Sequence, residues 1–142
     1  MMKRINWVLA AMAVAGLGAG CDGLQEPRQV IPPPETPNFT LYVSNQSFEM
    51  DVVDIEVRLD GELAVTGDFE VGSQHTWLPF HFQLSPGLHT LTSTTRTGSR
   101  KVELSSTVQV SDERDYGVLS FWTGREGATF AFNFMDDQPG FD

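Results

Sequence analysis

Apolar and polar residues alternate with a period of two along much of the chain after residue 38. In VVDIEVRLD, residues 52–60, the apolar side chains lie on one face and the charged side chains on the other. The apolar ones are Val53, Ile55, Val57 and Leu59. Such alternation is typical of a β-strand that buries one face. The next dipeptide, Asp60-Gly61, predicts a two-residue hairpin turn, because both residues tolerate a positive φ angle.

The same alternation recurs in later segments, which are separated by turn signals about every eight to twelve residues. No helical periodicity follows Cys21. The pattern predicts an all-β fold, an antiparallel β-sandwich of about seven to eight strands within residues 39–135. The later side chains expected to face inward are Leu63, Val65, Leu78, Phe80, Phe82, Leu84, Val102, Leu104, Val108, Val110, Phe130, Phe132 and Phe134.

Two short runs carry a resemblance at the level of turns. VRLDGELAV, followed by LSPGLHTL, resembles the hairpins of immunoglobulin-like and transthyretin-like β-sandwich modules in secreted bacterial proteins. The resemblance implies one of these two sandwich types. It implies no activity, because one fold serves many functions.

The first residues predict an exported protein. Lys3 and Arg4 precede an uncharged run from Trp7 to Gly20, which is too short for a membrane-spanning helix of about 20 residues. A charged start, a short apolar run and small residues describe a signal peptide, here residues 1–20. The sequence LGAGC, which ends at Cys21, resembles the lipobox of bacterial lipoproteins. The resemblance implies cleavage after Gly20, a diacylglyceryl group on the Cys21 thiol and acylation of the new amino terminus.

Removal of residues 1–20 would make the net charge of the mature chain more negative. The full chain has 9 Lys and Arg against 19 Asp and Glu, and loss of Lys3 and Arg4 leaves 7 against 19, a net charge of −12. Nucleic acid would repel such a chain, so it is not expected as a partner. We expect membrane contact through the lipid on Cys21, in the cell envelope. The choice between inner and outer membrane, and between the periplasmic side and the surface, stays open.

The segments on either side of the sandwich have distinct compositions. Residues 21–38 contain five of the eight prolines and show no periodicity, which predicts an extended linker that holds the domain away from the bilayer. Residues 136–142 form an acidic C-terminal tail.

Signatures of chemistry are sparse. The sequence holds no nucleophile elbow, phosphate-binding glycine loop or metalloprotease motif, so we expect no enzyme and no cofactor. Alternation points His81 outward and places His89 on the face of Leu91, which argues against a shared zinc site. The acidic pairs lack calcium-loop spacing, so no metal is expected. Asn45-Gln46-Ser47 fits a glycosylation sequon, which we interpret as accidental in a bacterial protein.

The loops suggest a candidate partner surface. If all sequential strands are antiparallel, loops 45–51, 67–76, 95–100 and 123–128 share one end of the sandwich. That end would gather the residues of a candidate partner surface for an envelope protein or an anionic ligand. These residues are Arg96, Arg100, Arg125, His75 and Trp77. We expect this end to point away from the membrane, although the same residues also suit ordinary exposed turns.

Two functional classes follow from the sequence. The first is a lipid-anchored, non-enzymatic binding or assembly module of the cell envelope. The alternative is an accessory ligand-binding domain, for carbohydrate or for calcium-dependent adhesion. Trp77 and Trp122 distinguish them, because sugar binding needs exposed indoles as a platform.

Overall fold

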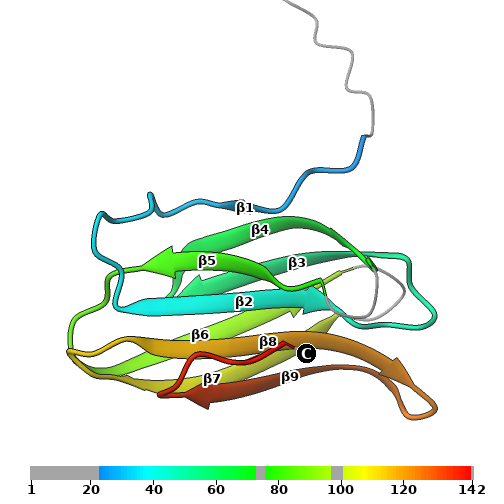
Figure 1. Cartoon of the computed structure of the whole chain (residues 1–142). Helices are drawn as coiled ribbons and strands as arrows, with labels where there is room; N and C mark the ends of the chain where they lie inside the picture. The colour runs from blue at the N-terminus through cyan, green and yellow to red at the C-terminus, as the bar shows by residue number, and fades with distance from the viewer. Residues whose placement is uncertain (1–22, 73–75, 97–100, 142) are drawn as a thin grey trace, which may run out of the picture.

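The computed structural model describes residues 23–72, 76–96 and 101–141 (Figure 1). Within these ranges the chain forms β-strands and no helix. The strands are β1 (Arg28–Gln29), β2 (Phe39–Asn45), β3 (Val52–Leu59), β4 (Glu62–Glu70), β5 (Leu78–Phe82), β6 (Gly87–Thr95), β7 (Val102–Val110), β8 (Asp115–Gly124) and β9 (Gly127–Met135).

The strands form two sheets that face each other as a sandwich (Figure 1). One sheet has the order β1-β4-β3-β6-β7, and the other has the order β5-β2-β8-β9. The predicted all-β sandwich is therefore confirmed, and β2 to β9 match the eight expected strands. One pairing differs from the expected antiparallel pattern, because β2 and β8 are parallel neighbours. Strand direction alternates along the chain, and five strands separate β2 from β8. The two strands therefore run in the same direction.

The core lies between the sheets and follows the predicted alternation. Val53, Ile55, Val57 and Leu59 of β3 are buried, and so are Val108 and Val110 of β7. Phenylalanine side chains fill much of the space, with Phe121 and Phe130 in an edge-to-face contact at 5.4 Å between ring centroids. At about 25 cal/mol per Å² of buried apolar surface, these rings and the aliphatic side chains around them stabilise the fold. Phe134 was expected inside but is exposed, because it lies near the end of β9.

The β3–β4 hairpin turns at Asp60 and Gly61, as predicted. Their φ angles are 51° and 82°, which is the geometry of a tight hairpin turn with both central residues left-handed. A β-bulge between Val57 and Arg58 on one strand and Leu63 and Val65 on the other shifts the register. The extra residue, Ala64, is buried, and Leu63 is only half-buried instead of facing fully inward.

The proline-rich linker is extended, but its described part is not a free spacer. Arg28 and Gln29 form β1, which pairs antiparallel with β4 through Thr66 and Val65. On either side, the Asp68 amide donates to the Gln25 carbonyl and the Val30 amide donates to the Ala64 carbonyl. The segment thereby covers the edge of β4, whose backbone groups would otherwise be open to pairing with other chains.

Candidate functional site

The connections between strands gather at two opposite ends of the sandwich. One end, here called the Phe48 end, carries the described residues of four connections, which are 46–51, 71–72 with 76–77, 96 with 101, and 125–126. The other, the His89 end, carries connections 60–61, 83–86 and 111–114. The predicted grouping of loops is therefore confirmed. Binding or chemistry at either end depends on which side chains these connections bring together.

The structure brings part of the predicted partner surface together. Arg96 follows β6, Arg125 lies in the β8–β9 turn and Trp77 precedes β5, so all three belong to the Phe48 end. His75 and Arg100 lie outside the described residues, as does Cys21. The Arg96 amide donates to the Asp54 carboxylate at 3.2 Å.

Acidic as well as basic residues lie at this end. Among the described residues its cations are Arg96, Lys101 and Arg125, and acidic residues of the same connections oppose them. These acidic residues are Glu49, Asp51 and Glu126, with Glu70 at the adjoining end of β4. Lys101 is also paired with Glu103 at 2.8 Å. Counting loop arginines alone overlooked the carboxylates beside them.

Trp77 faces outward but is covered by the C-terminal tail. Its indole stacks on Phe141 at 5.1 Å between ring centroids, and Phe141 also meets the edge of Tyr42 at 4.9 Å. The acidic tail therefore packs against the β5-β2-β8-β9 sheet, which its composition did not predict. Trp122 remains exposed on β8. With one face of Trp77 occupied, the two indoles do not form the open platform expected of a sugar-binding site.

The loop before β3 is held by buried polar side chains. The Asn45 side-chain amide donates to the carbonyls of Met50 (3.0 Å) and Phe69 (3.1 Å), and its oxygen accepts from the Ser47 amide (3.0 Å). The Ser47 hydroxyl accepts from the amides of Glu49 and Met50 and shares a 2.6 Å hydrogen bond with Thr123. Asn45 and Ser47 are almost fully buried.

This fixed loop presents Phe48 to solvent. The Phe48 side chain is 75% exposed, the largest exposed fraction among large apolar residues in the described ranges. The signal for the loop was present in the sequence as Asn45-Gln46-Ser47, which we interpreted as an accidental sequon. Asn and Ser two residues apart also favour turns in which their side chains bond to nearby backbone groups.

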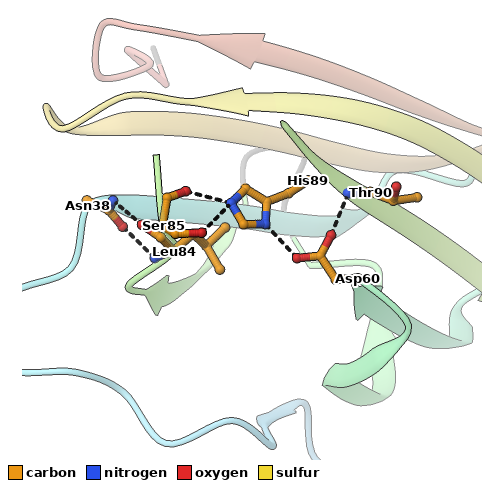
Figure 2. A network of polar contacts seen from close by, with 6 residues as sticks. All are labelled: Asn38, Asp60, Leu84, Ser85, His89 and Thr90. Atoms are coloured by element: carbon orange, nitrogen blue, oxygen red, sulfur yellow. Dashed lines mark hydrogen bonds and ion pairs between the residues drawn. The ribbon is translucent and has the colours of Figure 1, made fainter. Parts of the chain in front are cut away.

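The His89 end contains a network of polar contacts (Figure 2). His89, on β6, places Nδ1 2.5 Å from Asp60 Oδ2, in the β3–β4 turn. Its Nε2 lies 2.6 Å from the Ser85 carbonyl oxygen and 3.4 Å from the Ser85 hydroxyl. The second oxygen of Asp60 accepts from the Thr90 amide at 2.8 Å. Asp, His and Ser in this order have the composition of a hydrolytic triad.

The hydrogen bonds of His89 distinguish the network from a catalytic triad. A triad histidine must accept the serine proton at Nε2. In this network both ring nitrogens face oxygens that accept hydrogen bonds, a carboxylate and a carbonyl, so the ring satisfies both when it is protonated. Accordingly, the hydrogen bond with Asp60 and then that with Ser85 raise the pKa of His89 above its ordinary value of 6.5. The bond with His89 lowers the pKa of Asp60 below its ordinary value of 3.8.

The network joins three connections to the start of β2. The Asn38 side-chain amide donates to the Leu84 carbonyl (2.7 Å), and the Leu84 amide donates back to the Asn38 oxygen (2.8 Å; Figure 2). The Asp115 carboxylate accepts from the Ser111 amide at 2.6 Å in the neighbouring connection. An open hollow of about 590 Å³ lies beside these contacts, bounded by residues 35–38, 83–86 and 112–114. The network therefore holds turns in place around a shallow surface.

Neither a metal centre nor a membrane-spanning helix is present in the described ranges. No group of three or more His, Cys, Asp or Glu residues there is placed to hold a metal ion. His81 instead shares a 3.0 Å hydrogen bond with Thr40 on the outer face of its sheet. No helix in the same ranges is long and apolar enough to cross a membrane. No protein-family model, curated protein or solved structure matches the chain.

Proposed function

We propose that this protein is a bacterial lipoprotein of the cell envelope, whose β-sandwich serves as a non-enzymatic binding or assembly module. The observation that carries the proposal is the sequence LGAGC, in which small residues precede the sole cysteine after a short apolar run. A lone thiol in an exported chain has no intramolecular disulfide partner, and lipidation gives it a role.

The start of the described chain is compatible with this processing. Gly23 and Leu24 are exposed, and hydrogen bonding to the sandwich begins at Gln25. A peptidase and acyltransferases need access to the chain at Cys21, two residues before Gly23. The exposed start favours that access without unfolding of the domain.

The non-enzymatic part of the proposal is supported by the chemistry of the His89 end. The array of Asp60, His89 and Ser85 places both histidine nitrogens against oxygens that accept hydrogen bonds, the Asp60 carboxylate and the Ser85 carbonyl. Its groups hold the β3–β4 turn against the connection between β5 and β6.

Acyl labelling in a bacterial host tests the proposal. The wild-type chain is expected to incorporate labelled palmitate, to lose residues 1–20 and to fractionate with membranes. The Cys21→Ser variant is expected to lose all three properties. The Gly23→Ser variant is the matched control, because it alters an exposed residue just outside the lipobox and should behave as wild type. A Cys21→Ser protein that still carries palmitate would contradict the proposal.

A further inference from the structure

The path of the first described residues fixes where an anchor at Cys21 meets the sandwich. β1 runs antiparallel to β4, so following the chain backward from Arg28 leads towards the end of β4. The Gln25 amide donates to the Asp68 carboxylate at 2.7 Å, and Leu24 then lines a hollow of about 400 Å³ with Gly72 and Thr76. The first described segment, blue in Figure 1, therefore begins at the Phe48 end.

This path favours an orientation opposite to the expected one. The sequence suggested that the chain enters the domain directly at β2, with the Phe48 end pointing away from the membrane. The antiparallel strand β1 instead returns the chain along the whole domain before β2 begins. Cys21 precedes Gly23 by two residues, which span at most about 7 Å. A lipid on Cys21 would therefore lie nearer to the Phe48 end than to the opposite end.

The Phe48 end also carries exposed apolar side chains. Phe48 is accompanied by Leu24, which is 59% exposed, and by Val71, whose amide donates to the Asp51 carbonyl at 2.8 Å and so ties it to the Phe48 loop. Trp122 is exposed on β8, two residues before that strand ends. The hydrogen bonds of Asn45 and Ser47 keep Phe48 from folding back onto the core. Phe48 is thus held in water by a fixed loop, and several exposed apolar side chains at the same end of the sandwich favour a contact surface there.

The charge of this end indicates which surface it meets. Arg96, Lys101 and Arg125 are balanced by carboxylates in the same connections, so attraction to anionic headgroups does not drive the contact. Apolar insertion at a zwitterionic interface needs no such attraction. We propose that the Phe48 end rests on the bilayer that holds the lipid anchor, with Phe48 and Leu24 inserted at the boundary between headgroups and acyl chains. The proposal rests on the lipid anchor at Cys21.

Fluorescence from single positions tests this contact in the full lipidated protein. Cysteine is introduced by Phe48→Cys and, as the matched control, by Leu88→Cys. Leu88 is 70% exposed and lies on β6 near the His89 end. Because the lipidated Cys21 has no free thiol, each new cysteine takes up one environment-sensitive NBD label. The protein is reconstituted into vesicles of phosphatidylcholine and phosphatidylethanolamine, and its lipid content is checked by palmitate labelling.

We expect the label at position 48 to emit at shorter wavelength in vesicles than in detergent-free buffer, and to be quenched by lipids with a nitroxide on the acyl chain. The label at position 88 should show neither effect. Equal exposure of both labels in a protein that carries its lipid would overturn the bilayer contact and leave the anchor standing. Absence of lipid on Cys21 would overturn both. Shielding of position 48 in cell membranes but not in pure lipid vesicles would assign this end to a protein partner and would also overturn the contact.

Discussion

His89 and Asp60 depend on each other's charge across the β3–β6 pairing. The His89 ring is about 10% exposed, and the Asp60 carboxylate is about half exposed. Asp60 also occupies a left-handed turn position, where Asp and Asn are tolerated. Asp60 therefore has two roles. It accommodates the left-handed backbone of the turn, and its carboxylate interacts with the His89 ring.

The shifted pKa values give this pair a defined pH dependence. The raised pKa of His89 means that its contribution to stability is full below pH 6.5 and is lost as pH rises through the raised value. The lowered pKa of Asp60 means that its contribution is present above pH 3.8 and is lost as pH falls through the lowered value. The pair is therefore expected to stabilise the fold most between these limits.

Asp60→Asn keeps the turn and removes the charge. We expect the variant to lose on the order of 1 kcal/mol of unfolding free energy at about pH 6, because half of the carboxylate surface is screened by water. The loss should shrink towards about pH 9, as pH rises through the raised pKa of His89 and its ring loses its charge. Urea denaturation of the mature chain measures this difference, with Asp112→Asn in an exposed turn as control. An equal loss at both pH values would show that charge plays no part.

The sequence predicted the turn and the position of His89, but not the contact between His89 and Asp60. Asp60-Gly61 identified the turn, and alternation placed His89 on the inner face beside Leu91. The contact between them joins residues 29 positions apart, and it depends on the β3–β6 register. No local pattern specifies that register. Phe48 was missed for a related reason, since the side chains that hold its loop bond to Phe69 and Thr123, which are distant in sequence.

Among the elements, β1 sets the course of the N-terminal segment along the edge of β4. It is only two residues long and depends on close approach to β4 at Gly67. A Cβ atom at Gly67 would lie 2.5 Å from Pro27 Cα and 2.8 Å from the Glu26 carbonyl oxygen. Gly67 also has a φ angle of 149°, which residues other than glycine rarely adopt. Glycine at this position lets the N-terminal segment lie flat along the edge.

Gly67→Ala is expected to displace the N-terminal segment while the two sheets stay folded. The amides of Val30 and Asp68, which bond across this contact, should lose protection from hydrogen exchange. Gly61→Ala is the control, because Gly61 also has a positive φ angle but a Cβ atom there would meet no other atom within 4 Å. Unchanged protection of Val30 in Gly67→Ala would contradict the role assigned to this glycine.

The alternation of apolar and polar residues identifies some strands and gives no signal for others. Strands such as β3 and β7 alternate between buried and more exposed positions, so period two identifies them, whereas β2 and β8 in the middle of their sheet are largely buried on both faces. β1 covers an edge through backbone hydrogen bonds and lies among prolines, so it leaves no periodic signal. The parallel β2–β8 pair was missed because strand direction can be counted along the chain, whereas strand order within a sheet cannot.

For the whole molecule, the two ends are expected to have different surroundings. With the Phe48 end on the bilayer, the His89 end faces away from the membrane. It carries the open hollow, which Arg114 borders together with Glu35, Asp112 and Glu113. A soluble or envelope partner would reach this end first. Under the same proposal, the partner surface that the sequence placed around Arg96 and Arg125 would lie on the membrane side.

The proposed lipid anchor at Cys21 is tested most directly by the mass of the mature amino terminus. Protein purified from bacterial membranes is digested, and its N-terminal peptide is analysed by mass spectrometry. The predicted peptide begins at Cys21 and carries a diacylglyceryl group on sulfur and an acyl chain on the amine. A peptide that begins elsewhere, or one that contains Cys21 with a free thiol, would contradict the lipoprotein assignment.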